Sequence, residues 1–372
     1  MDGLRFVAIG SVFLYHMLGE LAQRSGRIIP VEANYHWLEQ ILEHGNRGVP
    51  LFFVISGMIL AMPFARHHLL GSKPISLRKY YMRRVTRLEP PYIASLVLAV
   101  LLVAVYQRGV SAEYLGHLLA SMVYQHSLIF GRISPVNSVT WSLEIEIQFY
   151  LFAPLAMQVY RLRRIWLRRV LLVVTILGLG LLQARFQTWP RFTMSILYYA
   201  QYFLAGLVVA DVFVLDLEKL NSSWLWDLVG IAALVAIFGP ASSAILHTLM
   251  PIAIAALFPA AMRSRGLRRV FANEWVAVIG GMCYSIYLLH FLFIAVLFKM
   301  TRHAILPQAM FFTNYAIQLL LVVLPVLLLC AVFFVLVERP CMDPDWPSKL
   351  WHALTGHPES EVAVLDAGGI SE

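Results

Sequence analysis

The stretch GLRFVAIGSVFLYHMLGE, residues 3–20, is almost wholly apolar and yet contains an arginine and a histidine. Its length is close to the roughly 20 residues that a helix needs to cross a bilayer. Arg5 and His16 are close to three helical turns apart, so both lie on one face, about 16 Å apart along the axis. Ionisable residues inside an apolar span are costly and mark a candidate functional site.

The rest of the chain has the composition of a membrane protein. Of its 372 residues, 60% are hydrophobic and 13% are charged, and the mean hydropathy is +0.72. Soluble domains carry about 25% charged residues. The apolar runs are long, and they lack the alternation that is typical of β-barrel strands. We therefore predict an all-α, polytopic transmembrane helical bundle.

We predict about ten membrane spans joined by short loops. They cover residues 3–20, 48–63, 90–106, 140–159, 166–183, 195–214, 224–239, 244–262, 276–298 and 314–337. One transmembrane domain over residues 1–340 thus uses almost the whole chain. A polar cytoplasmic tail over 341–372 follows, and its composition predicts disorder from about residue 351.

The basic residues predict the orientation in the membrane. With the N-terminus inside, the cytoplasmic segments hold 20 of the 29 Lys and Arg residues, against 9 outside. This bias predicts that both termini are cytoplasmic. It also accounts for the net charge of +8 without a nucleic-acid partner. The three cysteines have no spacing typical of a disulfide framework or a zinc site, so we expect no metal.

A second group of arginines leads into the third span. The stretch YYMRRVTRLEPP, residues 80–91, places Arg84 and Arg87 three residues apart, hence as neighbours on one helical face. Membrane topology alone explains most basic residues of this loop. However, Arg5 is predicted at the same membrane edge, and a guanidinium group can bind two phosphate oxygens at once through parallel hydrogen bonds. Together the three arginines predict an anion site.

A glutamate enters the membrane from the opposite side. In SVTWSLEIEIQFY, residues 138–150, Glu146 falls about six residues inside the fourth span, and Tyr150 follows one turn later. A carboxylate at that depth requires a partner. We expect His16 and Glu146 at a similar depth in the outer half of the bilayer. His16 could then act as a general base, with Glu146 orienting its imidazole or stabilising its charge.

Further polar residues lie inside other spans. Ser56 and Gly57 end FFVISG, residues 52–57, which indicates either close helix packing or a substrate contact. Tyr284 and His290 stand in CYSIYLLH, residues 283–290, where His290 could support another site residue or serve packing alone. Glu338 ends the last span and could pair with the basic inner loops.

Taken together, the motifs resemble those of the acyltransferase-3 family of bacterial inner-membrane O-acyltransferases. Six motifs occur in the order found in that family and cover nearly the whole chain. They are Asp-Gly-Leu-Arg at 2–5 followed by His16, FFVISG at 52–57, Arg84-x-x-Arg87, Trp141-Ser-Leu-x-x-Glu146 followed by Tyr150, Tyr284-Ser-x-Tyr-Leu-x-His290, and Glu338-Arg-Pro340.

The resemblance implies a multi-pass acyltransferase of the bacterial inner membrane, transferring groups other than amino-acyl groups. The donor would be cytosolic acetyl-CoA or another acyl-CoA, used as a substrate rather than as a tightly bound cofactor. The acceptor would be a hydroxyl of a cell-envelope glycan or glycolipid, such as O-antigen, exopolysaccharide or peptidoglycan. Arg5 and His16 match the family's paired arginine and histidine, Arg84 and Arg87 its inner basic motif, and Glu146 a family glutamate. Acceptor, acyl group and the choice between direct transfer and a covalent intermediate remain open.

The chain also departs from the family pattern. Several residues often precede the Asp-Gly-Leu-Arg motif, whereas Met1 abuts it here. The second glutamate often found after Glu146 is Ile147, and Glu144 stands where a small polar residue is common. No fused extracellular esterase-like domain is present in this sequence, so we expect any such partner to be separate.

A protein of another class would use the same polar residues differently. A secondary transporter or glycolipid flippase could employ His16, Glu146 and His290 as a proton relay. Such proteins are typically built from inverted repeats, and we find no clear internal symmetry. Uptake or flipping without acyl-CoA would favour this alternative.

Overall fold

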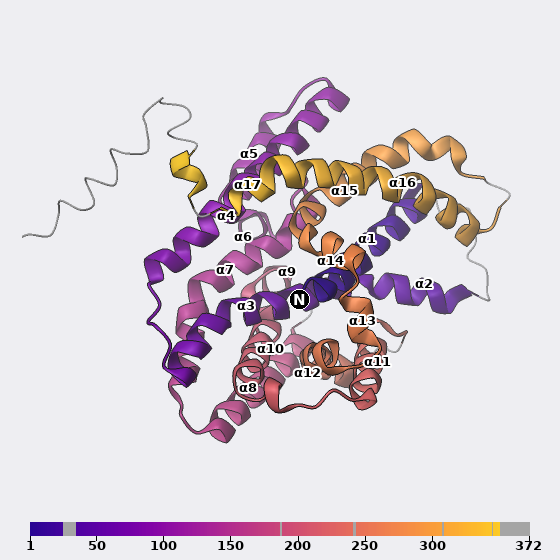
Figure 1. The fold of residues 1–372 in the computed structure, drawn as a ribbon. Helices are drawn as coiled ribbons and strands as arrows, with labels where there is room; N and C mark the ends of the chain where they lie inside the picture. The colour runs from indigo at the N-terminus through magenta and orange to yellow at the C-terminus, as the bar shows by residue number, and fades with distance from the viewer. Residues whose placement is uncertain (25–34, 187, 241–242, 307–308, 344, 350–372) are drawn as a thin grey trace, which may run out of the picture.

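In a computed structural model, the protein is a helical bundle over the residues that the structure describes, namely 1–24, 35–186, 188–240, 243–306, 309–343 and 345–349 (Figure 1). Eight helical stretches within these ranges are long and apolar enough to cross a membrane. Each predicted span overlaps at least one helix, which confirms the all-α polytopic fold. The helices that overlap the predicted spans are α1 (Asp2–Arg24), α3 (Gly48–Leu70), α4 (Leu77–Gln107), α7 (Trp141–Ala156), α8 (Ile165–Arg185), α10 (Ile196–Leu215), α11 (Trp224–Phe238), α12 (Ala244–Arg263), α15 (Cys283–Thr301) and α16 (Phe311–Phe333). Helices α7 and α11, of 16 and 15 residues, are not among the eight long stretches.

Shorter helices occupy the connections. They are α2 (His36–Glu43), α5 (Ala112–Met122), α6 (His126–Phe130), α9 (Pro190–Thr193), α13 (Leu267–Phe271), α14 (Glu274–Gly281) and α17 (Arg339–Cys341). The two longest predicted outer loops, 21–47 and 107–138, thus contain helices that the hydropathy pattern did not predict. The tail predicted to be disordered from about residue 351 lies outside the described residues.

Helix α1 lies between two halves of the bundle (Figure 1). Near its start, Leu4 and Ala8 pack into a hydrophobic core built mainly from α3, α7, α8, α10 and α12. Further along, Phe13 and Met17 pack into a second core built mainly from α4, α15 and α16. The polar residues of α1 are therefore held where the two cores meet.

The basic run before the third span belongs to the span helix itself. Helix α4 begins at Leu77, well before the predicted start of the span at residue 90, and Ser76 caps it by accepting a hydrogen bond from the Lys79 amide. A side-chain oxygen at this position satisfies an amide that the first helical turn leaves free. The arginines of the run consequently project from a continuous helix rather than from a loop.

The ninth predicted span is broken. Helix α14 ends at Gly281 and α15 begins at Cys283, with Met282 between them. The amide of Ser285, in the first turn of α15, donates a 2.9 Å hydrogen bond to the carboxylate of Glu338. Glu338 itself closes a π-helical segment, Phe334–Glu338, that continues α16. Wide turns of this kind are frequent at functional sites.

Helices α3 and α10 approach closely through glycine. A Cβ atom on Gly57 would collide with the backbone of Phe203, and one on Gly206 would lie 2.5 Å from the Val54 carbonyl oxygen. Small residues at such a crossing let two membrane helices pack backbone against backbone. The packing role predicted for Gly57 is confirmed.

We expect Gly206→Val to destabilise the bundle by about 1–3 kcal/mol, because the added side chain must push α10 away from α3. The measurement is thermal unfolding of the purified protein in detergent. Gly178→Val is the matched control, since a Cβ atom on Gly178 in α8 meets nothing within 4 Å. Equal effects of the two substitutions would contradict close packing at Gly206.

Candidate active site

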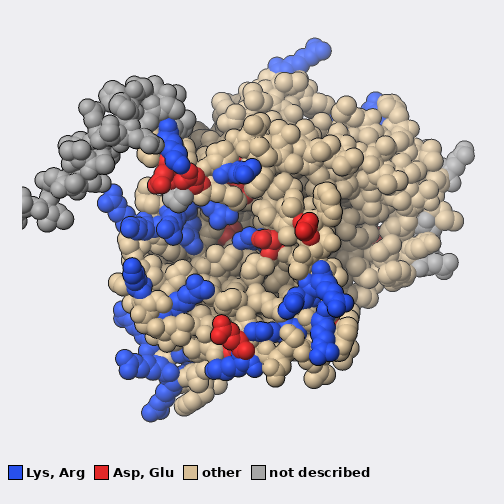
Figure 2. All heavy atoms as spheres, in the orientation of Figure 1, with Lys and Arg blue, Asp and Glu red and all other residues tan. Residues whose placement is uncertain are grey.

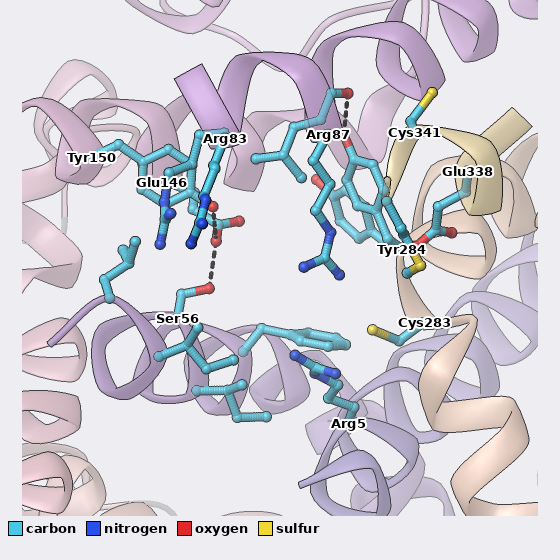
Figure 3. Close-up of a pocket in the computed structure, with 18 of the residues that line it drawn as sticks. Arg5, Ser56, Arg83, Arg87, Glu146, Tyr150, Cys283, Tyr284, Glu338 and Cys341 are labelled. Atoms are coloured by element: carbon cyan, nitrogen blue, oxygen red, sulfur yellow. Dashed lines mark hydrogen bonds between the residues drawn. The ribbon is translucent and has the colours of Figure 1, made fainter. Parts of the chain in front are cut away.

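A pocket of about 620 Å³ lies among α1, α3, α4, α7 and α15 (Figure 3). Its walls combine apolar side chains with charged groups of both signs. The charged lining residues are Arg5, Arg83, Arg84, Arg87, Glu146 and Glu338. All three arginines that the sequence placed at an anion site, Arg5, Arg84 and Arg87, thus line one cavity together with Glu146.

Three arginines of the pocket come from one face of α4. Arg83 and Arg87 are four residues apart and Arg84 and Arg87 three, so the helix brings them side by side. The guanidinium carbon of Arg84 lies 4.5 Å from the centroid of the Tyr80 ring, and this cation–π interaction stabilises the position of the Arg84 side chain. Arg83 and Arg87 are directed into the pocket (Figure 3). This cluster presents several N–H donors to one space, as phosphate binding requires.

Arg5 reaches the same pocket from α1. Its Nη1 forms a 2.7 Å ion pair with Asp2, one turn earlier, and its side chain remains partly exposed. The guanidinium has five N–H donors, so this single short contact leaves most of them available. The face of the molecule seen in Figure 2 is hollowed near its centre and carries many Lys and Arg side chains. Such a basic surface favours the approach of anionic ligands.

Glu146 points into the arginine pocket. Its Oε1 accepts hydrogen bonds from the hydroxyls of Ser56 on α3 and of Tyr150, the latter at 2.5 Å (Figure 3). No hydrogen bond or ion pair joins Glu146 to His16 in the described part of the chain, so the pairing expected from the sequence is not found. The reason is that α7 packs against α3 and α10, which turns Glu146 toward Ser56.

His16 lies outside the pocket lining, further along α1 from Arg5. Its half-buried ring contacts those of His290 and Phe291, with centroids 5.2 and 4.9 Å away. Tyr287, one turn before His290 on α15, does line the pocket. Helices α1 and α15 therefore both connect the pocket with the surroundings of His16.

The other residues predicted from the sequence occupy different places. Tyr284 lines the pocket and donates a 2.9 Å hydrogen bond to the Leu88 carbonyl. Trp141 packs its ring 5.5 Å from that of Tyr199 and is not part of the pocket lining. Glu338 lines the pocket, but instead of an ion pair with a basic loop it accepts the hydrogen bonds of Ser285.

Sequence reasoning missed several residues of the pocket. Arg83 was not named as a candidate site residue, although its four-residue spacing from Arg87 could have identified it. Cys283 and Cys341 carry no motif of their own and reach the pocket only through the break before α15 and the turn after the π segment. Nothing in the hydropathy pattern marks either feature.

Comparison with known proteins assigns the chain to a family. The model of the acyltransferase domain of acyltransferase family 3 matches residues 1–335. Over 200 residues the chain is 28% identical to the peptidoglycan O-acetyltransferase OatA of Listeria monocytogenes, covering 50% of this chain and 28% of that protein. Over 194 residues it is 26% identical to the O-acetyltransferase OatA of Staphylococcus aureus, covering 49% and 28%. No solved structure matches.

The chain belongs to the acyltransferase-3 family, since the family model covers most of its length. The family resemblance drawn from the six ordered motifs is confirmed. The chain is a multi-pass membrane protein with bacterial relatives, and it spans less than a third of the length of the curated relatives that it matches.

Proposed function

We propose that this protein is an O-acyltransferase of the bacterial inner membrane. It would move an acyl group, with acetyl as the first candidate, from cytosolic acyl-CoA to a hydroxyl of a cell-envelope glycan. The observation that carries the proposal is the arginine-lined pocket, which shares helix α1 with His16. Family membership and the O-acetyltransferase names of the relatives support the same reading.

The pocket would hold the donor. Arg5, Arg84 and Arg87, together with Arg83, would bind the phosphates of acyl-CoA on the side of the membrane that the positive-inside bias predicts to be cytoplasmic. Along α3 the lining runs from Phe52 to Pro63, about 16 Å of helix rise, so the cavity is elongated. An extended acyl-thioester arm would then end beside Tyr287, one turn from His290 and its neighbour His16.

His16 would serve as the general base. In a direct transfer, the acceptor hydroxyl gives its proton to the imidazole while its oxygen attacks the thioester carbonyl. The new C–O bond forms, the C–S bond breaks, and the CoA sulfur leaves as a thiolate that the imidazolium can protonate. The acceptor enters from the outer side, so donor and acceptor meet within the membrane.

Glu146 would act in donor binding rather than on His16. Its contacts with Ser56 and Tyr150 fix a carboxylate opposite the arginines of the same pocket. Such a carboxylate limits how deeply a second anionic group can enter, because like charges repel in a low-dielectric site. The phosphates would therefore stay at the arginine end while the uncharged arm passes further in.

Mass spectrometry of envelope glycans from cells with and without the gene tests the proposal. We expect one acyl mass to be missing from a glycan of the deletion strain and to return on complementation. The mass lost identifies the acyl group, and the sugar that loses it identifies the acceptor. Unchanged glycans, together with transport or flipping by the reconstituted protein without acyl-CoA, would overturn the proposal in favour of a transporter.

A further inference from the structure

His290 is held in one tautomer inside α15. Its side chain is fully buried, and Nδ1 lies 2.8 Å from the carbonyl oxygen of Ile286 and 3.0 Å from that of Tyr287. A carbonyl oxygen only accepts hydrogen bonds, so Nδ1 must carry a hydrogen. No acidic side chain in the described ranges bonds to this ring, and a buried charge without a partner is costly, which favours the neutral form. Nε2 of His290 therefore carries a lone pair.

Within the described residues, that lone pair has no hydrogen-bond partner. Nε2 of His290 is buried and makes no hydrogen bond within the part of the chain that the structure describes. Buried polar atoms in folded proteins are nearly always paired, so one that is not paired needs an explanation. A group that donates to Nε2 during the protein's work would supply it.

His16 is placed to be that donor. The two imidazole centroids are 5.2 Å apart, and the ring planes are inclined at 53°. Phe13, one turn before His16 on α1, also packs against the His290 ring, with centroids 6.1 Å apart, so α1 and α15 hold the pair together. The terminal torsion of a histidine is broad and cheap to change. A rotation of the half-buried His16 ring can therefore bring one of its nitrogens to Nε2.

We propose that His290 is the positioning residue for His16. Its Nε2 accepts the hydrogen of whichever His16 nitrogen faces it, so the other His16 nitrogen is left with the lone pair that receives a proton. When His16 becomes an imidazolium, the same hydrogen bond stabilises the new charge. The inference rests on the proposed role of His16 as the base, and it gives to a neutral histidine the role that the sequence had suggested for Glu146.

Two amide substitutions mimic the two nitrogen atoms of the His290 ring separately. In His290→Gln the amide can place an acceptor near the former Nε2. In His290→Asn the amide can still donate to the helix carbonyls but offers nothing at Nε2. We expect His290→Asn to lower kcat for acyl transfer about 10- to 100-fold, the effect of a lost hydrogen bond to a charged group, with KM for acetyl-CoA changed less than about twofold. His290→Gln should remain within about fivefold of the wild type.

A structural role would give a different pattern. If His290 served packing alone, the Asn and Gln variants would lose activity in parallel with their melting temperatures, or neither would lose any. Equal kcat values for the two variants, or a change confined to KM, would therefore overturn the proposal.

The reactivity of His16 provides a readout that does not depend on acyl transfer. Diethyl pyrocarbonate modifies unprotonated imidazole nitrogens, and mass spectrometry measures the rate at His16 in the full-length protein. At pH 7 we expect this rate to fall several-fold in His290→Asn and to stay near the wild-type value in His290→Gln. If acyl transfer is absent but this pattern holds, the proposed function fails and the pairing stands. If all three proteins react alike, the pairing fails whatever the activity.

Discussion

His16→Ala is expected to insert and fold normally and to lose acyl transfer by roughly 100- to 10,000-fold, the contribution that a positioned general base makes. The loss should appear in kcat, because His16 is not part of the pocket proposed to hold acyl-CoA. The measurement is transfer of radiolabelled acetyl from acetyl-CoA by the protein in proteoliposomes, with the melting temperature recorded for the same preparations.

His36→Ala is the matched control for this substitution. His36 is an exposed histidine on α2 whose ring contacts only Glu39 among the described hydrogen bonds and ion pairs, so its removal should leave kcat unchanged. A correctly folded His16→Ala protein with more than a tenth of the wild-type kcat would rule out His16 as the base.

Arg87→Ala is expected to raise KM for acetyl-CoA about 10-fold or more while changing kcat little. A charge-assisted hydrogen bond is worth about 1.5–3 kcal/mol, and removal of an interaction made equally in ground and transition states shows in KM alone. Arg87→Lys should recover only part of the loss, because an ammonium group lacks the planar fork of the guanidinium. Arg78→Ala is the control, since Arg78 is exposed on the same helix and is absent from the pocket lining.

A shortened donor sharpens this test. S-acetyl-pantetheine carries the thioester but no phosphate, so its KM should be high and should not respond to Arg87→Ala. If Arg87 holds phosphate, substitution and donor truncation each remove the same interaction, and their effects will not add. Additive effects, or an equal rise in KM with Arg78→Ala, would show that Arg87 acts through general surface charge.

The sequence was sufficient to predict the spans because a bilayer imposes a simple rule. Helices must satisfy their own backbone hydrogen bonds across some 30 Å of hydrocarbon, and the apolar runs that do so are visible directly. Hydropathy does not reveal a break within a span when residues of another helix form the hydrogen bonds that the break leaves unmade. The break at Met282 is one, because Glu338 from another helix satisfies the Ser285 amide that the break frees.

The parts of the candidate site that depend on the spacing of residues along one helix could be predicted from the sequence. The three-turn spacing of Arg5 and His16 and the adjacency of Arg84 and Arg87 are properties of one helix each, and the structure retains them. The partner of Glu146 depends instead on which neighbour α7 packs against. Depth in the membrane can be estimated from sequence, but the direction around the helix axis in which a side chain meets another helix cannot.

The π segment Phe334–Glu338 determines the direction in which the Glu338 carboxylate points. A wide turn accommodates one residue more than the α-helix around it would. If the same residues formed a regular α-helix instead, everything beyond the segment would be rotated by about 100°. Glu338 would then leave the Ser285 amide, and the start of α15 would lose its cap. A regular α-helix in this segment would therefore remove one wall of the pocket, so the wide turn itself keeps Glu338 in place.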